Sequence, residues 1–376
     1  MWKVNDKWGL VIQDIVVTKN YKPSGQMRLL VLSSLLCLTY GLGVAEAADP
    51  PENWQYYKRV IIDHTKVSTN LTNFPVLIDI TDSDLQLHAQ IDGDDVLFTD
   101  CSNNKIPHEI ELYESGTGHL IAWVNTDLSS TEDTTVYMYY GNNATSNQEN
   151  ATNVWDSNYV MVQHLQETSG NHSDSTSNNN DGTPNGVNQD APGKIDGSDD
   201  FSGSDYIEVP DSASLDITGN FTLEAWVNYS STSGIQRIID KLASGASSGF
   251  DLGSGWTTNK IEVYARIGGS LVGSGVSTTT IQADTWYYVT GVYDGERLRL
   301  YVNGTEENNN GASGAVATNN LNLRIGDGSY YHNYFNGIID DVRISDTARD
   351  GNWIKTSYIN QNDPCGFYSI SNEMVS

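Results

Sequence analysis

The sequence predicts an all-β protein made of two β-sandwich domains. Short segments of alternating apolar and polar residues recur along the chain and are separated by Gly, Asn, Asp and Ser, which is typical of antiparallel sheets. In residues 221–228, Phe, Leu, Ala and Val alternate with Thr, Glu, Trp and Asn, so one face of this strand is apolar. Asn303-Gly304 follows the alternating run 297–302 and predicts a type I′ hairpin turn. A chain of 376 residues is long enough for two such domains.

The N-terminal segment predicts export from the cytoplasm. Met27-Arg28 is followed by an apolar run and then by Ala45-Glu46-Ala47, the pattern of a secretory signal peptide that is cleaved near Ala47. We assign residues 1–47 to this leader and expect translation to start at Met27, because residues 1–26 are polar and mixed; a long segment ahead of the signal is the alternative. The apolar run is shorter than the roughly 20 residues that span a bilayer. We therefore expect a secreted, periplasmic or cell-surface protein with no membrane span in the mature chain.

The composition narrows the class of partner. The formal net charge is −28, from 48 acidic and 20 basic residues. Such a surface repels phosphate backbones and anionic lipid headgroups, so we expect no binding to nucleic acid or to a membrane surface. A calcium-rich environment and a saline environment both explain this acidity, and the sequence leaves both open.

Residues 54–142 are predicted to form a first, small sandwich. A polar linker at 143–153 follows, which we expect to be extended and mobile because it has no apolar anchors. Residues 154–358 then form a larger sandwich, and the tail at 359–376 packs back on either domain. The six strands predicted for the first sandwich are 57–63, 74–80, 94–100, 106–114, 119–127 and 134–142.

Two families are similar to these regions. Residues 154–358 resemble the laminin-G-like (concanavalin A-like) jelly-roll family, through HLQETSG, DSTSNNNDGT, DDFSGSDYIEVP, FTLEAWV, WYYVTGVYDGERLRLYVNG and GIIDDVRIS in the family's order. Residues 54–142 resemble a bacterial and archaeal domain of unknown function, type 2341, through FPVLIDI, DDVLFTD, IPHEIELYE, AWVNTDL and VYMYYGN. The second resemblance implies a companion of laminin-G-like domains in secreted or surface proteins, some of which continue into a proton-channel subunit of the ExbB or TolQ type. Neither resemblance implies a reaction.

One acidic residue suggests a calcium site. Period-two alternation places Asp340 on the same strand face as Val342 and Ile344, where a carboxylate needs hydrogen bonds or a cation to offset its lost hydration. Calcium, with roughly six to eight oxygen ligands, is the natural cation in a secreted acidic protein. The jelly-roll resemblance implies that such an ion is held by an oxygen-rich loop and the Asp of the last strand. It nominates Asp174 and Asp340 as ligands of a structural calcium, with Asp181 as a weaker one. The alternative is that Asp340 accepts backbone N–H bonds and that the loop is solvated.

Four aromatic residues are candidates for stacking on a sugar, because an apolar ring face packs against sugar C–H groups while nearby polar groups bind the hydroxyls. The alternative is that they are ordinary core and rim residues. These candidates are Trp226, Trp256, Trp286 and Tyr331.

The mature chain retains two cysteines, Cys101 and Cys365. In an oxidising compartment they either form one disulfide that ties the first domain to the tail, or stay as separate thiols. Their number and spacing do not predict a zinc site.

Three patterns that resemble catalytic motifs are set aside. Glu109 and Glu111 have the spacing of paired glycosidase carboxylates, but they lie in a predicted domain that is too small for a long substrate cleft. Residues 245–249 match G-x-S-x-G without its strand–turn–helix context. The seven histidines show no metal-ligand spacing.

These features favour a secreted or surface protein that binds carbohydrate or another polymer, for adhesion or substrate capture, without catalysis. A glycan or cell-surface polymer is the expected partner. Two alternatives stay open. One is a polysaccharide-active glycosidase or lyase, and the other is a periplasmic ectodomain that works with envelope partners of the ExbB or TolQ type.

Overall fold

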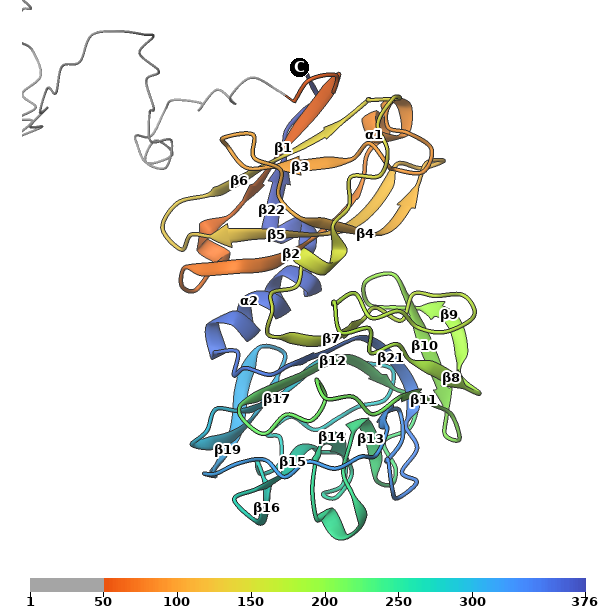
Figure 1. Ribbon diagram of the computed structural model, residues 1–376, viewed down its shortest axis with the longest axis vertical. Coiled ribbons are helices and arrows are strands. Elements are labelled where there is room, and N and C mark those ends of the chain that lie inside the picture. Colours follow the sequence, from red (N-terminus) through yellow and green to blue (C-terminus); the bar gives the residue numbers. More distant parts are fainter. Residues whose placement is uncertain (1–50) are drawn as a thin grey trace, which may run out of the picture. The chain divides into compact units, whose positions relative to one another are not determined.

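The computed structural model describes residues 51–376, in which β-strands dominate and form four sheets (Figure 1). The all-β prediction is confirmed. The signal peptide predicted at 1–47, with its start at Met27, lies outside the described residues. Within 51–376, no helix combines the length and apolar character that crossing a membrane requires.

The first sandwich consists of a five-stranded and a three-stranded sheet. The order of the larger sheet is β22-β1-β6-β3, with β23 also paired to β1, and that of the smaller sheet is β2-β5-β4. All six strands predicted for this region form, with shifted ends. The elements from the N-terminal part are β1 (Tyr56–Ile62), η1 (His64–Lys66), β2 (Leu71–Thr81), α1 (Ser83–His88), β3 (Leu97–Thr99), β4 (His108–Glu114), β5 (His119–Leu128), β6 (Thr134–Tyr140) and η2 (Ala151–Asn153).

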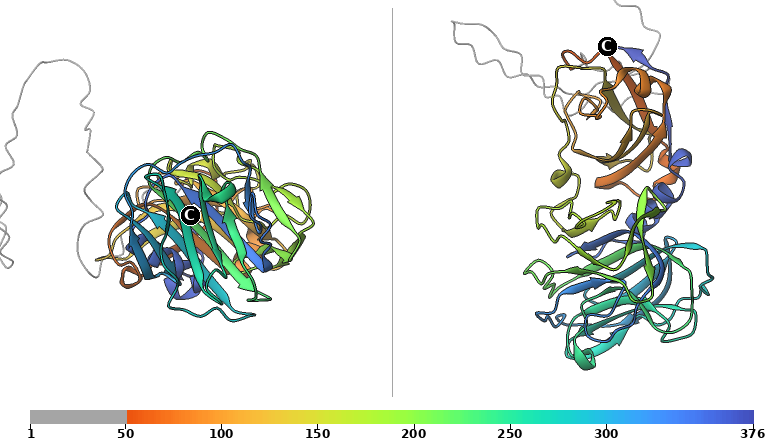
Figure 2. Two further views of the ribbon diagram at one scale, coloured as in Figure 1. Left: turned by 90° about the horizontal axis from the view of Figure 1, so that it is seen from below. Right: turned by 90° about the vertical axis from the view of Figure 1, so that its right-hand side faces the viewer.

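The second sandwich consists of an eight-stranded and a seven-stranded sheet, whose two layers are visible in Figure 2. The order of the first is β19-β18-β17-β12-β21-β10-β9 with β7 paired to β21, and that of the second is β16-β15-β14-β13-β20-β11-β8. The elements are β7 (Tyr159–Gln163), β8 (Thr183–Asn185), β9 (Asn188–Pro192), β10 (Gly197–Ser202), β11 (Tyr206–Val209), β12 (Phe221–Tyr229), β13 (Gln236–Asp240), η3 (Ser244–Ala246), β14 (Phe250–Ser254), β15 (Ile261–Ile267), β16 (Ser270–Gly273), β17 (Trp286–Tyr293), β18 (Arg297–Val302), β19 (Thr305–Gly311), β20 (Leu323–Ile325) and β21 (Asn336–Ser345).

Local patterns predicted this sandwich well. Leu223 and Val227 of β12 lie in the core between the two sheets, as the alternation indicates. Asn303 and Gly304 both have positive φ, 51° and 74°, and join β18 to β19 as a type I′ turn requires.

The opposite face of β12 is not exposed, although its residues include polar ones. Glu224 and Trp226 are both buried. One apolar cluster includes Trp226, Trp123 of the first sandwich and Trp353 of helix α2 (Gly351–Asn362). The outer face of the eight-stranded sheet is therefore covered by other parts of the chain.

The predicted tail belongs to the first sandwich. After α2, the chain forms α3 (Pro364–Phe367), β22 (Tyr368–Ile370) and β23 (Met374–Val375), and the last two strands pair with β1 (Figure 1). The Asn360 side chain accepts a hydrogen bond from Leu77 N at 2.7 Å and donates one to Leu77 O at 3.0 Å. Strands from the two ends of the described chain thus complete one sheet.

The segment 143–153 differs from the predicted mobile linker. Asn150 N donates to His108 O at 2.8 Å, and the Glu149 carboxylate accepts from Ile110 N at 2.7 Å. These bonds hold the segment against β4.

Candidate functional site

A cavity of about 720 Å³ opens on the outer face of the seven-stranded sheet. Asp251 of β14 and Tyr264 of β15 lie opposite each other in register and line the cavity. Their strand neighbours Leu252 and Val263 lie in the core of the sandwich. Because successive side chains of a strand point to opposite faces, the cavity lies on the side of the sheet away from that core.

The mouth of the cavity is apolar and open to solvent. Trp256 is 59% exposed, Tyr331 is 58% exposed, and Leu271 is also exposed. Residues 51–376 contain seven exposed large apolar side chains, and three of them, Trp256, Leu271 and Tyr331, line this cavity. The Trp256 ring meets the Tyr264 ring edge-on, with centroids 6.3 Å apart. Single exposed apolar side chains are common on protein surfaces, but a cluster of them around one cavity is typical of a binding site.

The base of the cavity is charged and buried. Arg237 Nη1 lies 3.4 Å from Asp251 Oδ1, and neither Arg237 Nη1 nor the two oxygens of Asp251 have a hydrogen bond within the protein. Burial raises the pKa of Asp251 to about 7, an effect that Arg237 opposes in part. Asp240 differs, because its Oδ1 accepts from Leu242 N at 2.9 Å and from Ser329 N at 2.8 Å. Asp251 is thus the carboxylate at this base whose two oxygens are both buried without a hydrogen bond.

The structure brings two of the four predicted aromatic residues together. Trp256 and Tyr331 line the cavity. Trp226 is 1% exposed and donates from Nε1 to Gln361 Oε1 at 2.7 Å, so its prediction as a ligand-stacking residue is wrong. Trp286 is partly buried and packs against the apolar cluster around Trp226.

Sequence reasoning missed the charged base of the cavity. Arg237 and Asp251 each lie next to apolar core residues in short strands. From the sequence alone, a charged residue at such a position is interpreted as an ordinary solvated side chain. The sequence offers one signal for this base, which is that Arg237 and Asp240 flank the apolar pair Ile238 and Ile239. In the structure, a β-bulge at this pair shifts the register of β13 against β14.

Asp174, a predicted calcium ligand, is already surrounded by donors. Its carboxylate accepts from Val162 N, Thr176 N and Asn180 N at 2.9, 3.0 and 2.8 Å, and from Thr176 Oγ1 at 2.8 Å. Asp181 Oδ1 accepts from Asp174 N at 2.9 Å. These bonds account for the loop conformation through protein donors.

Asp340 lies on the other face of its strand from the predicted one. Asp341 has a positive φ of 52°, and the pairing with β12 shifts register there, so that Asp340 is opposite Trp226. Because of this bulge, Asp340 faces away from the core that contains Val342 and Ile344.

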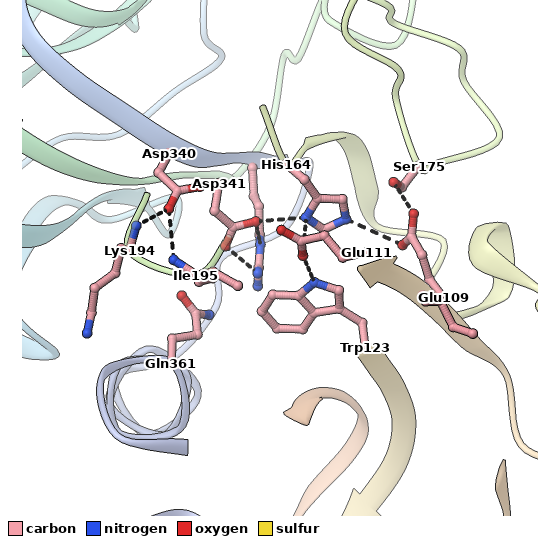
Figure 3. A network of polar contacts seen from close by, with 12 residues as sticks. Glu109, Glu111, Trp123, His164, Ser175, Lys194, Ile195, Asp340, Asp341 and Gln361 are labelled. Carbon is pink, nitrogen blue, oxygen red and sulfur yellow. Dashed lines mark hydrogen bonds and ion pairs between the residues drawn. The ribbon is translucent and has the colours of Figure 1, made fainter. Parts of the chain in front are cut away.

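The Asp340 carboxylate is fully buried at this position. Its Oδ2 accepts from Lys194 N at 2.6 Å and Ile195 N at 3.0 Å, whereas Oδ1 has no hydrogen bond within the protein (Figure 3). Burial, with Asp341 and Glu111 nearby, raises the pKa of Asp340 well above its ordinary value.

The three predicted calcium ligands do not form one group. Within residues 51–376, the set of three or more His, Cys, Asp or Glu side chains close enough to share an ion is Asp63, His64 and Asp133, all at least partly exposed. Calcium binding through Asp174, Asp181 and Asp340 stays a prediction.

Glu109 and Glu111 belong to a buried network rather than to a substrate cleft. The His164 ring lies between them, with nitrogens 3.4 Å from Glu109 Oε2 and 3.3 Å from Glu111 Oε2, and it also contacts Asp341 (Figure 3). Trp123 Nε1 donates to Glu111 at 2.7 Å. Burial alone would lower the pKa of His164, but Glu111 and Glu109 raise it well above its ordinary value.

This network joins the two sandwiches, since Glu109 and Glu111 lie on β4 and Asp341 lies on β21. Asp341 also pairs with Arg343, whose guanidinium lies 4.2 Å from the Trp123 ring. The arrangement is suited to holding the sheets together, and the side chains of Glu109 and Glu111 are only 12% and 1% exposed.

Of the two alternatives for Cys101 and Cys365, a disulfide between them does not form. Cys365 is a free, exposed thiol at the start of α3. The tail is tied to the first sandwich by strand pairing and hydrogen bonds instead.

Comparison with known proteins supports the two resemblances. Residues 201–355 match the family model described as the concanavalin A-like lectin/glucanases superfamily, and residues 92–183 match that of a domain of unknown function (DUF2341). The chain therefore contains a concanavalin A-like domain preceded by a DUF2341 region. No curated protein matches the chain.

Several solved structures are similar to about half of the chain. The binding domain of Paraclostridial Mosquitocidal Protein 1 is 13% identical, over 54% of this chain and 52% of that one, with a TM-score of 0.45. Domain 4 of AbnA, an extracellular arabinanase from Geobacillus stearothermophilus, solved with arabinotriose, is 20% identical over 52% and 96%, with a TM-score of 0.44. The botulinum neurotoxin serotype D binding domain is 13% identical over 56% and 53%, with a TM-score of 0.43. The match thus spans only about half of the first and third of these chains, and similarities this weak carry no functional argument.

Proposed function

We propose that the concanavalin A-like domain of this chain binds a glycan in the cavity of the seven-stranded sheet, and that the protein acts by binding rather than by catalysis. The observation that carries the proposal is the clustering of Trp256, Leu271 and Tyr331 around one cavity whose base is polar.

The combination of apolar mouth and polar base suits a sugar. Ring faces of Trp256 and Tyr331 can cover the C–H faces of a pyranose or furanose, which are apolar, while hydroxyls reach Arg237 and Asp251. The cavity volume lies within the roughly 300–1,000 Å³ of typical small-ligand sites. A purely apolar ligand would bury the charges at the base without hydrogen bonds, which is costly.

The glycosidase alternative receives no support from the carboxylates that suggested it. Glu109 and Glu111 are both occupied by His164 and by tryptophan N–H groups. In the cavity, Asp240 lies opposite Asp251 on the next strand, but its Oδ1 is held by two backbone donors, so it is poorly placed to act as a nucleophile or base.

Three further parts of the proposal rest on the sequence. They are secretion or surface display through the N-terminal signal, a structural calcium, and capture of a surface polymer as the biological role. The alternative role with an envelope partner of the ExbB or TolQ type stays a prediction, and genes for such a channel beside this one would favour it.

The test uses the full chain on a glycan array, followed by titration calorimetry with the strongest glycan. Trp256→Ala removes the largest ring at the mouth, and we expect it to weaken binding about five- to thirtyfold, since stacking of this kind is worth about 1–2 kcal/mol. Leu271→Ala and Leu87→Ala form a matched pair. Both residues are exposed leucines, but Leu87 lies on α1 of the first sandwich, so only Leu271→Ala should reduce affinity.

Absence of binding to every glycan on the array would refute the proposal. So would unchanged affinity of Trp256→Ala, which would place the site elsewhere. Release of reducing sugar from a bound polysaccharide, abolished by Asp251→Asn, would replace the binding role by catalysis.

A further inference from the structure

The base of the cavity presents one unused donor, Arg237 Nη1, beside a carboxylate whose two oxygens are both unused acceptors. Arg237 Nη1 and Asp251 Oδ1 are 3.4 Å apart, which is an ion pair without a hydrogen bond, and both atoms lack any hydrogen bond within the protein. Asp251 is 0% exposed and Arg237 nearly so, yet both line the cavity. Buried polar atoms are rarely left unpaired, so these two point to a missing partner.

Neighbouring polar side chains already have partners within the protein. Asp240 is held by backbone N–H groups, as described above. Glu262 accepts from Thr257 N at 2.8 Å and lies 3.2 Å from the Tyr264 hydroxyl. His332 pairs with Asp327 at 2.9 Å. Among these residues, the buried side-chain atoms without a hydrogen bond belong to Arg237 and Asp251.

The charge at this base is predominantly negative. Asp240 and Asp251 line the cavity together with Arg237, and Glu262 is buried on the adjacent strand β15, outside the lining. In the described residues, no group of ligand atoms close enough to share a metal ion includes these three carboxylates. A bound anion would meet the carboxylates of Asp240 and Asp251, with Glu262 behind them, in a poorly solvated site where like charges repel strongly.

We propose that the cavity selects neutral glycans, and that one ligand hydroxyl enters between Asp251 and Arg237, donating its hydrogen to the carboxylate and accepting from the guanidinium. A hydroxyl is both donor and acceptor, so a single group satisfies Arg237 Nη1 and one of the two bare oxygens of Asp251. Uronic acids and sulfated sugars are rejected by the carboxylates. This inference rests on the proposed glycan-binding function and adds the class of glycan.

The experiment uses an array of matched pairs that differ only in charge. Each pair holds a neutral oligosaccharide and its uronate with the same linkage and length, such as β-1,4-linked glucose and β-1,4-linked glucuronate tetrasaccharides. We expect the neutral member of each bound pair to bind at least about tenfold more tightly at low ionic strength, with a smaller ratio at high salt.

Variants then test the hydroxyl position. Asp251→Asn keeps the shape of the side chain but removes its charge, and we expect about a tenfold loss of affinity for the neutral sugar and a reduced bias against the uronate. Glu208→Gln is the matched control, because Glu208 lies on β11 of the same sheet, pairs with Arg324 and does not line the cavity. It should leave both affinities unchanged.

The outcomes separate this inference from the function it rests on. Binding to glycans with uronates equal to or tighter than their neutral partners would overturn the selectivity and leave glycan binding intact. No binding to any member would overturn both. If Asp251→Asn does not fold, as judged by its thermal melt, the wild-type ratios and their salt dependence still decide the matter.

Discussion

Replacing Asp174 by alanine should destabilise the second sandwich even when no calcium is present. The carboxylate accepts three backbone N–H bonds, from Val162, Thr176 and Asn180, and one from the Thr176 hydroxyl. These bonds connect β7 to the loop that follows it. Alanine leaves all of these donors without an acceptor.

The magnitude follows from the three backbone donors. Each unsatisfied buried donor costs about 1–3 kcal/mol, and the lower end applies here because Asp174 retains slight exposure through which water can reach the loop. We therefore expect the free energy of unfolding to fall by about 3–4 kcal/mol. Asp181→Ala removes a single acceptor at an exposed position of the same loop, and it should cost less than about 1 kcal/mol.

Urea denaturation of the full chain, with a chelator and with excess calcium, is the decisive assay. If protein donors hold the Asp174 carboxylate, the loss in Asp174→Ala is the same in both conditions. The reasoning is refuted if Asp174→Ala costs less than 1 kcal/mol in chelator while the wild type gains several kcal/mol from calcium that the variant does not gain. That result would establish the calcium site that the sequence predicts.

Two further predictions concern the contacts between the sandwiches and the tail. Burial and the neighbouring acids raise the pKa of Glu111 to about 7, so the native state holds this proton more tightly than the unfolded chain does. The free energy of unfolding should therefore fall by about 3 kcal/mol as the pH rises from about 4.5 through 7. Glu111→Gln retains an acceptor for Trp123 Nε1 and should flatten that slope in unfolding curves measured across this pH range. A slope unchanged in the variant would contradict this assignment. Asn360→Leu loses both hydrogen bonds to the buried Leu77 backbone and should lower the free energy of unfolding by about 2–4 kcal/mol. Asn352→Leu, on the exposed side of the same helix, should leave the free energy of unfolding nearly unchanged. Equal effects of the two variants would show that the hydrogen bonds of Asn360 contribute nothing specific.

Local sequence patterns determined the strands and turns. The alternation of β12 indicates which residues enter the core, and Asn303-Gly304 indicates a hairpin because few other residue pairs adopt positive φ twice in succession. The exposed aromatics Trp256 and Tyr331 were also recognisable, since large apolar rings in polar loops favour a binding site. These features depend on neighbours in the chain.

The remaining features depend on what packs against each face. Trp226 and Asp340 both lie on the outer face of their sheet. The alternation of residues cannot reveal that the first sandwich and α2 cover that face. It also cannot reveal that a bulge at Asp341 changes the side on which Asp340 lies. The charges at the base of the cavity are equally hidden, because Arg237 and Asp251 become a pair only when β13 and β14 align in the sheet. Period and turn chemistry specify the direction of a side chain relative to its own strand, whereas burial and pairing arise from segments that are distant in sequence, so only the tertiary structure decides them.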